Sequence, residues 1–170
     1  MDIKYRALNP EDSLQYRNVR LESLKLNPDC FGSKYLEQVN LQTLYFERLI
    51  EEGCENNIML GAFYESKLIG LCGITIQSSD TAEITQMYVE FNYRGNSIGV
   101  NLLSLAKKYA STRFKVATLN LTVYADNESA IRSYEKSGFK IAESMPDLDE
   151  NELYMEFEVE TVKVKAFTHD

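Results

Sequence analysis

The segment 81–99, TAEITQMYVEFNYRGNSIG, decides the fold because it combines a strand, a turn and a helix start. Residues 84–89 are mostly apolar and favour a strand, and residues 92–95 contain the Asn and Gly of a turn. The apolar residues that follow recur at helical spacing. They are Ile98, Leu102, Leu105, Ala106 and Tyr109. The segment therefore predicts a strand, a short polar loop and the first turns of a helix.

The loop at 94–99 has the character of an anion site. A loop that opens directly into a helix exposes backbone N–H groups without partners, and the positive end of the helix dipole adds to them. The loop lacks the three glycines of the dinucleotide fingerprint and the Gly-Lys-Ser/Thr end of the triphosphate loop. A dinucleotide oxidoreductase is therefore excluded. An ordinary strand-to-helix turn with Gly95 at a positive φ remains an alternative.

The composition is that of one globular domain. The chain has 170 residues, of which 44% are apolar and 26% are charged. No run approaches the roughly 18 apolar residues of a membrane span, and the N-terminus lacks the pattern of a secretory signal. Cys30, Cys54 and Cys72 have no metal-ligand spacing, so we expect reduced thiols in a cytoplasmic protein.

The charge balance restricts the partners. Lysine and arginine number 18 against 26 acidic residues, and the net charge is −8. This acidity argues against nucleic acid or an anionic membrane and is compatible with a cationic substrate such as an amine. The single histidine, His169, is the penultimate residue, so histidine triads and histidine-rich metal sites are not expected.

The rest of the chain predicts strands and helices on both sides of this segment. Before it, we expect strands at 3–7, 58–64 and 68–76 and helices at 9–26 and 36–52. After it, we expect strands from 118, 140 and 155, and a helix from 126 that stops at Gly138. The class is α/β, or α+β in detail, with a mixed, mostly antiparallel sheet of about six to seven strands flanked by about four helices.

Apolar stripes indicate how the two N-terminal helices pack on the sheet. The residues are Leu14, Leu21 and Leu24 in the first helix and Leu41, Leu44, Tyr45 and Leu49 in the second. Residues 68–76 form a nearly continuous apolar run, which is typical of a strand buried on both faces. Gly70 and Gly73 within that run predict bulges or close packing.

A second motif lies at 127–139, NESAIRSYEKSGF, and fits N-x-x-A-x-x-x-Y-x-x-x-G-F. Singly, Asn127 as an N-cap, Tyr134 as a core residue and Gly138 as a C-cap would each have a structural explanation. Together with the loop RGNSIG, this motif resembles the GNAT superfamily of acetyl-coenzyme A-dependent N-acetyltransferases. The loop resembles that family's R-x-x-G-x-[GA] pyrophosphate loop, with Ser97 where the family usually has glycine. Ser97 could instead cap the helix through its hydroxyl.

The resemblance implies a GNAT domain at 1–162, a tail at 163–170, and acetyl-coenzyme A as co-substrate without a metal. Strand backbone groups would pair with the pantetheine arm, and loop amides would hold the pyrophosphate. The implied cofactor-binding residues are Met87, Tyr88, Val89, Arg94, Gly95, Asn96, Ser97, Ile98, Gly99, Asn127, Ser129 and Tyr134.

The resemblance also implies residues for attack by an amine. An amine with a pKa of about 10 is protonated at neutral pH, and only its neutral form attacks a thioester. Glu83 resembles the strand glutamate that serves some members as general base, often through one water, although a solvated surface glutamate is the alternative. Tyr134 resembles the tyrosine that protonates the departing thiolate. The N–H of Val89 would stabilise the charge on the thioester oxygen.

The acceptor stays open. The resemblance assigns its recognition to the first two helices and the loops over the cleft, including Glu22, the loop at 28–33 with Phe31, and Glu37. The acidic balance favours a small amine (polyamine, amino acid or aminosugar), attacking directly in a ternary complex. A protein N-terminus or lysine is the runner-up. A coenzyme A-binding regulatory module without catalysis is an alternative of another class, which the presence of Tyr134 and Glu83 disfavours. A homodimer is compatible with the family.

Overall fold

The computed structural model describes residues 1–31, 34–143 and 148–160. The expected tail at 163–170, residues 32–33 of the loop at 28–33, and residues 144–147 lie outside these ranges. In chain order the elements are β1 (Ile3–Ala7), the 3-10 turn η1 (Pro10–Asp12), α1 (Ser13–Leu26), α2 (Tyr35–Gln38), α3 (Tyr45–Glu51), β2 (Asn57–Tyr64), β3 (Lys67–Ile76), β4 (Thr81–Val89), the 3-10 turn η2 (Phe91–Tyr93), α4 (Ile98–Tyr109), the π-helical turn η3 (Ala110–Phe114), β5 (Thr118–Tyr124), α5 (Glu128–Lys136), β6 (Lys140–Ile141) and β7 (Glu152–Glu158).

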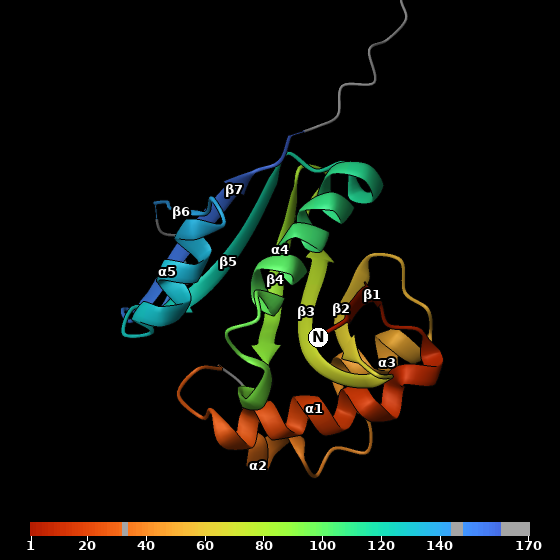
Figure 1. Ribbon diagram of the computed structural model, residues 1–170. Coiled ribbons are helices and arrows are strands. Elements are labelled where there is room, and N and C mark those ends of the chain that lie inside the picture. The colour runs from red at the N-terminus through yellow and green to blue at the C-terminus, as the bar shows by residue number, and fades with distance from the viewer. Residues whose placement is uncertain (32–33, 144–147, 161–170) are drawn as a thin grey trace, which may run out of the picture.

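The strands form one 7-stranded sheet in the order β1-β2-β3-β4-β5-β7-β6 (Figure 1). Every neighbouring pair is antiparallel except β4 and β5, which run parallel. The mixed, mostly antiparallel sheet and the meander β2-β3-β4 confirm the predicted class. The single parallel pair requires a crossover, and the chain makes it through α4.

Helices cover both faces of the sheet. On one face Tyr16 of α1 and Phe46 of α3 pack with Met59, Phe63 and Leu71. On the other face a larger cluster joins α4 to the sheet, and it includes Leu60, Ala62, Ile69, Leu102 and Ala106. β2 and β3 are therefore buried along almost their whole length, as their continuous apolar sequences predict. None of the helices in the described ranges is long and apolar enough to cross a membrane.

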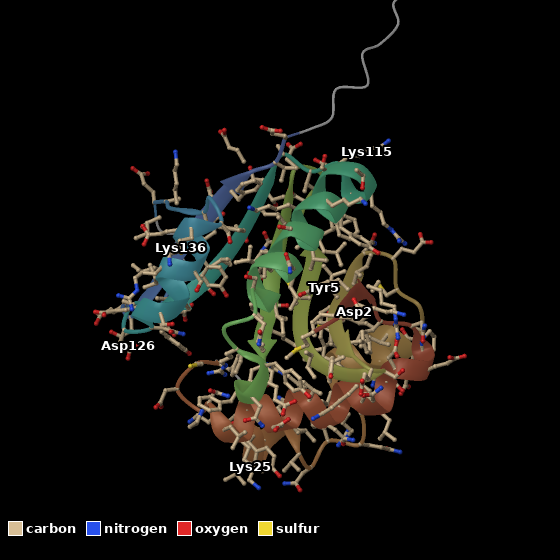
Figure 2. The ribbon with its side chains drawn as sticks, in the orientation of Figure 1. Asp2, Tyr5, Lys25, Lys115, Asp126 and Lys136 are labelled. Carbon is tan, nitrogen blue, oxygen red and sulfur yellow. The ribbon has the colours of Figure 1, made fainter. Side chains whose placement is uncertain are left out.

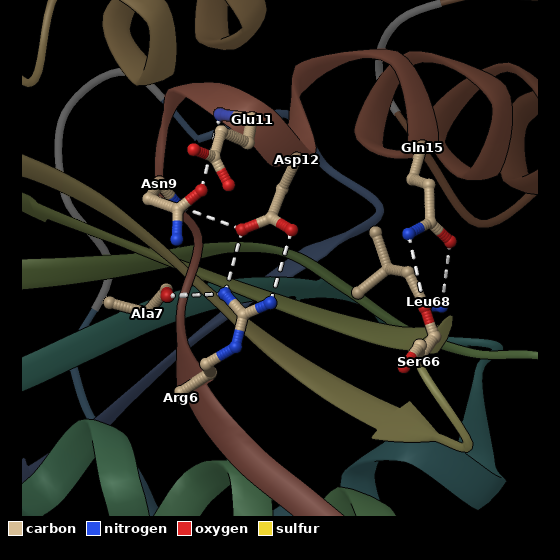
Figure 3. Close-up of polar contacts among 8 residues, drawn as sticks. All are labelled: Arg6, Ala7, Asn9, Glu11, Asp12, Gln15, Ser66 and Leu68. Atoms are coloured by element: carbon tan, nitrogen blue, oxygen red, sulfur yellow. Dashed lines mark hydrogen bonds and ion pairs between the residues drawn. The ribbon is translucent and has the colours of Figure 1, made fainter.

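The turn η1, which leads into α1, carries a capping box (Figure 3). The Asn9 side chain accepts from the backbone N–H of Glu11 at 3.1 Å, and the Asp12 carboxylate accepts from the N–H of Asn9 at 2.8 Å. Arg6 of β1 donates to the same carboxylate at 2.7 Å and holds the pKa of Asp12 below its usual value. These contacts attach the helix start to the first strand.

The predicted apolar stripe of α1 is only partly correct. Leu24 is buried, but Leu14 is 68% exposed. The buried face of the helix instead carries Tyr16, Arg20, Ser23 and Leu24. The leucine pattern missed this face because two of its four members are polar, so the orientation of α1 came from tertiary packing.

The prediction of one helix at 36–52 is wrong, because the chain forms α2 and α3 with a non-helical segment between them. Arg17 of α1 donates to the carbonyl of Leu41 at 2.7 Å and to the carboxylate of Glu47 at 2.8 Å. Glu47 also accepts from the N–H of Leu44, which starts α3. A distant guanidinium thus satisfies carbonyls that a continuous helix would bond internally. Leu41 and Tyr45, expected in the stripe, are exposed.

Close packing explains both glycines of β3. A Cβ at Gly73 would lie 2.8 Å from the Thr85 hydroxyl oxygen, and one at Gly70 would lie 3.2 Å from Leu102. α4 also contacts β1, because Asn101 donates to the hydroxyl of Tyr5 at 3.1 Å, and Tyr5 is labelled in Figure 2. These contacts place α4 closely over the sheet beside β4.

Candidate active site

The candidate site is the cleft where β4 and β5 part. The two strands pair only over Thr81–Glu83 and Thr118–Asn120, and beyond these residues they diverge (Figure 1). A cavity of about 1040 Å³ occupies this divergence. Residues 84–89 and 121–124 of the two strands line it, together with the starts of α4 and α5 and part of α1. The cleft therefore reaches both faces of the sheet.

A β-bulge in β4 contributes to this divergence. Gly73 pairs with Thr85 and Leu71 pairs with Tyr88, so Gln86 and Met87 stand opposite Cys72 alone. Gln86 has a φ of 55°, which is left-handed. A bulge bends its strand and increases the local twist, so β4 turns away from β5. β4 itself carries no glycine or proline at this point. The glycines Gly70 and Gly73, where bulges or close packing were predicted, flank the irregularity on the facing strand β3, and the extra residue lies in β4.

The hydroxyl of Tyr16 on α1 donates to the Oε1 of Gln86 at 2.5 Å. Burial raises the pKa of Tyr16, so its hydroxyl stays protonated as a donor. The bond fixes the amide of the bulged residue and aligns α1 with the middle of β4. The position of the N-terminal helix and the shape of the cleft are therefore coupled.

The loop before α4 has the geometry of an anion site. Gly95 has a φ of 85°, and Ser97 is left-handed with a φ of 60°. The prediction that Ser97 caps the helix is wrong, because its side chain makes no capping bond and its backbone is not in the extended conformation of such caps. The first-turn N–H groups of α4 have no partner within the helix, and their residues Ile98, Gly99 and Val100 line the cavity. These donors can bind a phosphate.

Arg94 fixes the end of β4 next to this loop. Its Nε donates to the carbonyl of Val89 at 2.9 Å, and its Cζ lies 5.9 Å from the centroid of the Tyr88 ring. The backbone N–H of Glu90 donates to the carbonyl of Ile69 on β3. Since neighbouring residues of a strand direct their N–H groups to opposite sides, the N–H of Val89 points toward the cleft. A donor for a ligand carbonyl is thus present on β4.

α5 closes the second side of the cleft, and it begins after the turn that contains Asp126 (Figure 2). The Asn127 side chain caps the helix by accepting from the N–H of Ala130 at 3.3 Å. At the other end, Lys107 of α4 donates to the carbonyl of Ser137. These contacts hold α5 beside α4, so Asn127 and Tyr134 both line the cavity.

Tyr134 lies at the inner wall of the cleft. Its ring packs edge-on against Phe139 with the centroids 5.9 Å apart. Burial raises the pKa of the Tyr134 hydroxyl, and the nearby thiol of Cys72 adds to the shift. Burial raises the pKa of Cys72 to about 12, so the thiol is neutral as well. Tyr134 is therefore a protonated donor throughout the neutral range.

Glu83 stands where the two strands begin to separate. It pairs with Thr75 of β3 on one side and with Asn120 of β5 on the other. Glu83 is half-buried and belongs to none of the ion pairs among the described residues. Burial raises its pKa, because the ionised form loses solvation without gaining a cation. Glu83 is thus a carboxylate of increased basicity at the cavity wall.

The structure brings together most of the predicted site residues. All of them line the cavity except Asn96, whose amide donates to the carbonyl of Tyr93 at 2.9 Å and closes the loop. Of the residues considered for the acceptor, Phe31 lines the cavity, whereas Glu22 and Glu37 are exposed and do not. Arg20 also lines the cavity, and the residue patterns did not single it out. Within the described ranges, no three His, Cys, Asp or Glu side chains could hold a metal ion together.

Comparison with known proteins identifies the family. Residues 22–139, more than half of the chain, match the model of the acetyltransferase (GNAT) family. The streptothricin acetyltransferase of Escherichia coli is 28% identical over 91 residues, which are 54% of this chain and 52% of that relative. The matched region thus spans about half of that relative's length. The chain belongs to the GNAT acetyltransferase family.

Solved structures show the same fold. The PaiA N-acetyltransferase of Thermoplasma acidophilum, in complex with coenzyme A, superposes with a TM-score of 0.75 at 28% identity, over 93% of this chain and 99% of that one. A GNAT-family acetyltransferase of Streptococcus pneumoniae has a TM-score of 0.77 at 22% identity, also over 93% and 99%. The seven-stranded sheet and its helices are thus the GNAT fold.

Proposed function

We propose that the protein transfers the acetyl group of acetyl-coenzyme A to the primary amine of a small molecule, within a ternary complex. One observation carries the proposal: the uncapped start of α4 and the carboxylate of Glu83, whose pKa is raised, line the same cleft. The family membership supports acetyl transfer, and the coenzyme A complex of the PaiA structure supports the donor.

The residues on the α4 side fit a long thioester with a pyrophosphate. First-turn amides of α4 and Arg94 would bind the pyrophosphate, and the free edge of β4 at Met87 and Val89 would pair with the pantetheine arm. Asn127 and Ser129 lie across the cleft on the α5 side. Acetyl-coenzyme A supplies the activated acetyl group when bound.

The chain's own residues then account for the proton transfers. Glu83 accepts a proton from the substrate ammonium, directly or through one water, and the freed amine forms a bond to the thioester carbon. The N–H of Val89 donates to the carbonyl oxygen as it gains charge. When the carbon–sulfur bond breaks, Tyr134 donates to the departing thiolate, and the resulting tyrosinate takes up the second proton that the amine nitrogen loses as the amide forms. The products are an amide and free coenzyme A.

The first test is calorimetric titration with acetyl-coenzyme A, followed by a thiol-release screen over small amines and peptide N-termini. Binding with thiol release on a small amine is the expected result. Thiol release only with peptides would indicate that the acceptor is a protein N-terminus. Binding without release on any amine would favour a regulatory coenzyme A-binding module, and absence of binding would contradict the proposal.

A further inference from the structure

The buried guanidinium of Arg20 has no counter-ion among the residues that the structure describes. Arg20 is only 8% exposed, and within the ranges 1–31, 34–143 and 148–160 its buried Nη1 has no hydrogen-bond partner. The ion pairs of the described residues are Arg6–Asp12, Arg17–Glu47 and Lys67–Glu90, so Arg20 takes part in none. Burying a charge without compensation is unfavourable, and a charge that no described residue compensates at a cavity wall points to an anion bound there.

Neighbouring contacts direct Arg20 toward the cleft. Tyr16 and Arg20 are one helical turn apart on the same face of α1. Since Tyr16 bonds Gln86 in the bulge, this face of α1 points at the middle of β4. The ring of Phe31 covers the guanidinium, with 5.0 Å between its centroid and Cζ. The side chain is therefore held between α1 and the following loop, at the wall of the cavity.

The anion is not the pyrophosphate of the co-substrate. The phosphate-binding loop lies on the α4 side of the sheet, where a Cβ on Gly99 would meet the end of Met87 at 3.4 Å. Arg20 lies on the opposite side, because α1 packs on the other face with Met59, Phe63 and Leu71. An anion at Arg20 thus approaches from the acceptor side.

We propose that Arg20 binds a carboxylate of the acetyl acceptor, so that the acceptor is a small amine of the amino-acid type. The inference rests on the acetyl transfer proposed above. A planar guanidinium matches a carboxylate with two parallel hydrogen bonds. Glu83 lines the same cavity from β4 and would face the amine end. A basic group and an acidic group in one cleft suit a molecule with opposite charges at its two ends.

The test compares amines that differ only by a carboxylate. The protein, saturated with coenzyme A so that no turnover occurs, is titrated with lysine and cadaverine, ornithine and putrescine, and phenylalanine and phenethylamine. In at least one pair the carboxylate-bearing member should bind about tenfold more tightly or better, as expected for a charged hydrogen-bonded pair. Arg20→Met should abolish that preference, and Arg20→Lys should retain part of it.

Arg48→Met on the exposed side of α3 is the matched control and should keep the full preference. Arg20→Gln, which retains hydrogen-bond donors but no charge, is the second variant should Arg20→Met fail to fold. The acetyl-coenzyme A affinity of each variant is measured to verify that its co-substrate site is intact. No preference in any pair, through equal or absent binding, overturns the proposal, as does a preference that survives in the charge-removing variant. A carboxylate preference without thiol release would contradict the proposed transfer while supporting the role of Arg20.

Discussion

The two sides of the cleft are built from different kinds of group. The side assigned to acetyl-coenzyme A consists mainly of backbone: the free edge of β4 and the uncapped start of α4. The side assigned to the acceptor consists of side chains, chiefly Arg20, Phe31 and Glu83. Backbone donors depend on local conformation, which a short motif specifies, whereas convergent side chains depend on the packing of distant elements. The first side therefore suits a ligand shared by a family, and the second suits one particular acceptor.

The largest expected effect comes from filling the backbone side. Gly99→Trp should lower acetyl-coenzyme A affinity by about 100-fold or more, because an indole would cover the first-turn amides beside Met87. Calorimetric titration measures the loss. Gly99→Ala adds a single methyl in ordinary contact with Met87 and serves as the control. Normal affinity in a folded Gly99→Trp variant would mean that the co-substrate binds elsewhere.

Removing the Tyr134 hydroxyl should slow the chemical step without weakening the binding of acetyl-coenzyme A. Tyr134→Phe is expected to lower kcat by about 100-fold, the range for loss of a general acid, with acetyl-coenzyme A affinity unchanged. Stopped-flow thiol release and titration report the two quantities. Tyr109→Phe on α4 makes the same substitution outside the cleft and serves as the control. Unaltered kcat in Tyr134→Phe would show that this hydroxyl is not the acid.

Glu83→Gln tests the acceptor side through pH. Burial raises the pKa of Glu83, so the rate should rise with pH through a value above that of an ordinary carboxyl group. The variant should lose this low-pH limb and about tenfold to 100-fold in kcat/KM. The exposed Glu135→Gln is the control. A pH–rate profile identical to that of wild type would show that Glu83 is not the general base.

Glu83→Gln should also change the free energy of unfolding in a defined direction. A carboxyl whose folded-state pKa is raised favours folding at low pH, and this contribution is lost as pH rises through the folded-state pKa. At neutral pH Glu83→Gln should therefore be at least as stable as wild type. Chemical denaturation at pH 7 measures this, and a clear destabilisation would indicate that ionised Glu83 has a partner.

The smallest effect is expected at the contact that joins the two sides. Tyr16→Phe removes the bond to Gln86 and should cost about 1 kcal/mol, or roughly 2–4 °C in Tm. The acceptor KM should rise while acetyl-coenzyme A affinity stays unchanged, because α1 lies on the acceptor side. A double-mutant cycle with Gln86→Ala isolates the bond. Additive effects would show that the two residues are not coupled.

Local patterns predicted the fold more successfully than the acceptor side of the site. The alternating and continuous apolar runs placed the strands. Asn127 caps α5, and Asn9 caps the turn η1 that leads into α1. The errors occurred where distant groups compete with local preference. Arg17 satisfies carbonyls between α2 and α3, and the bulge at Gln86 is held by Tyr16 on α1.

The sequence by itself determined the family-like loop, the second motif and the order of elements, because each depends on residues close together in the chain. Only the tertiary structure decided that Arg20 is buried without a counter-ion in the described part of the chain and that α1 points it at the middle of β4. It also decided that Glu83 is half-buried in the cleft instead of solvated. Burial and the absence of a partner are properties of packing, and packing joins residues that no local pattern relates.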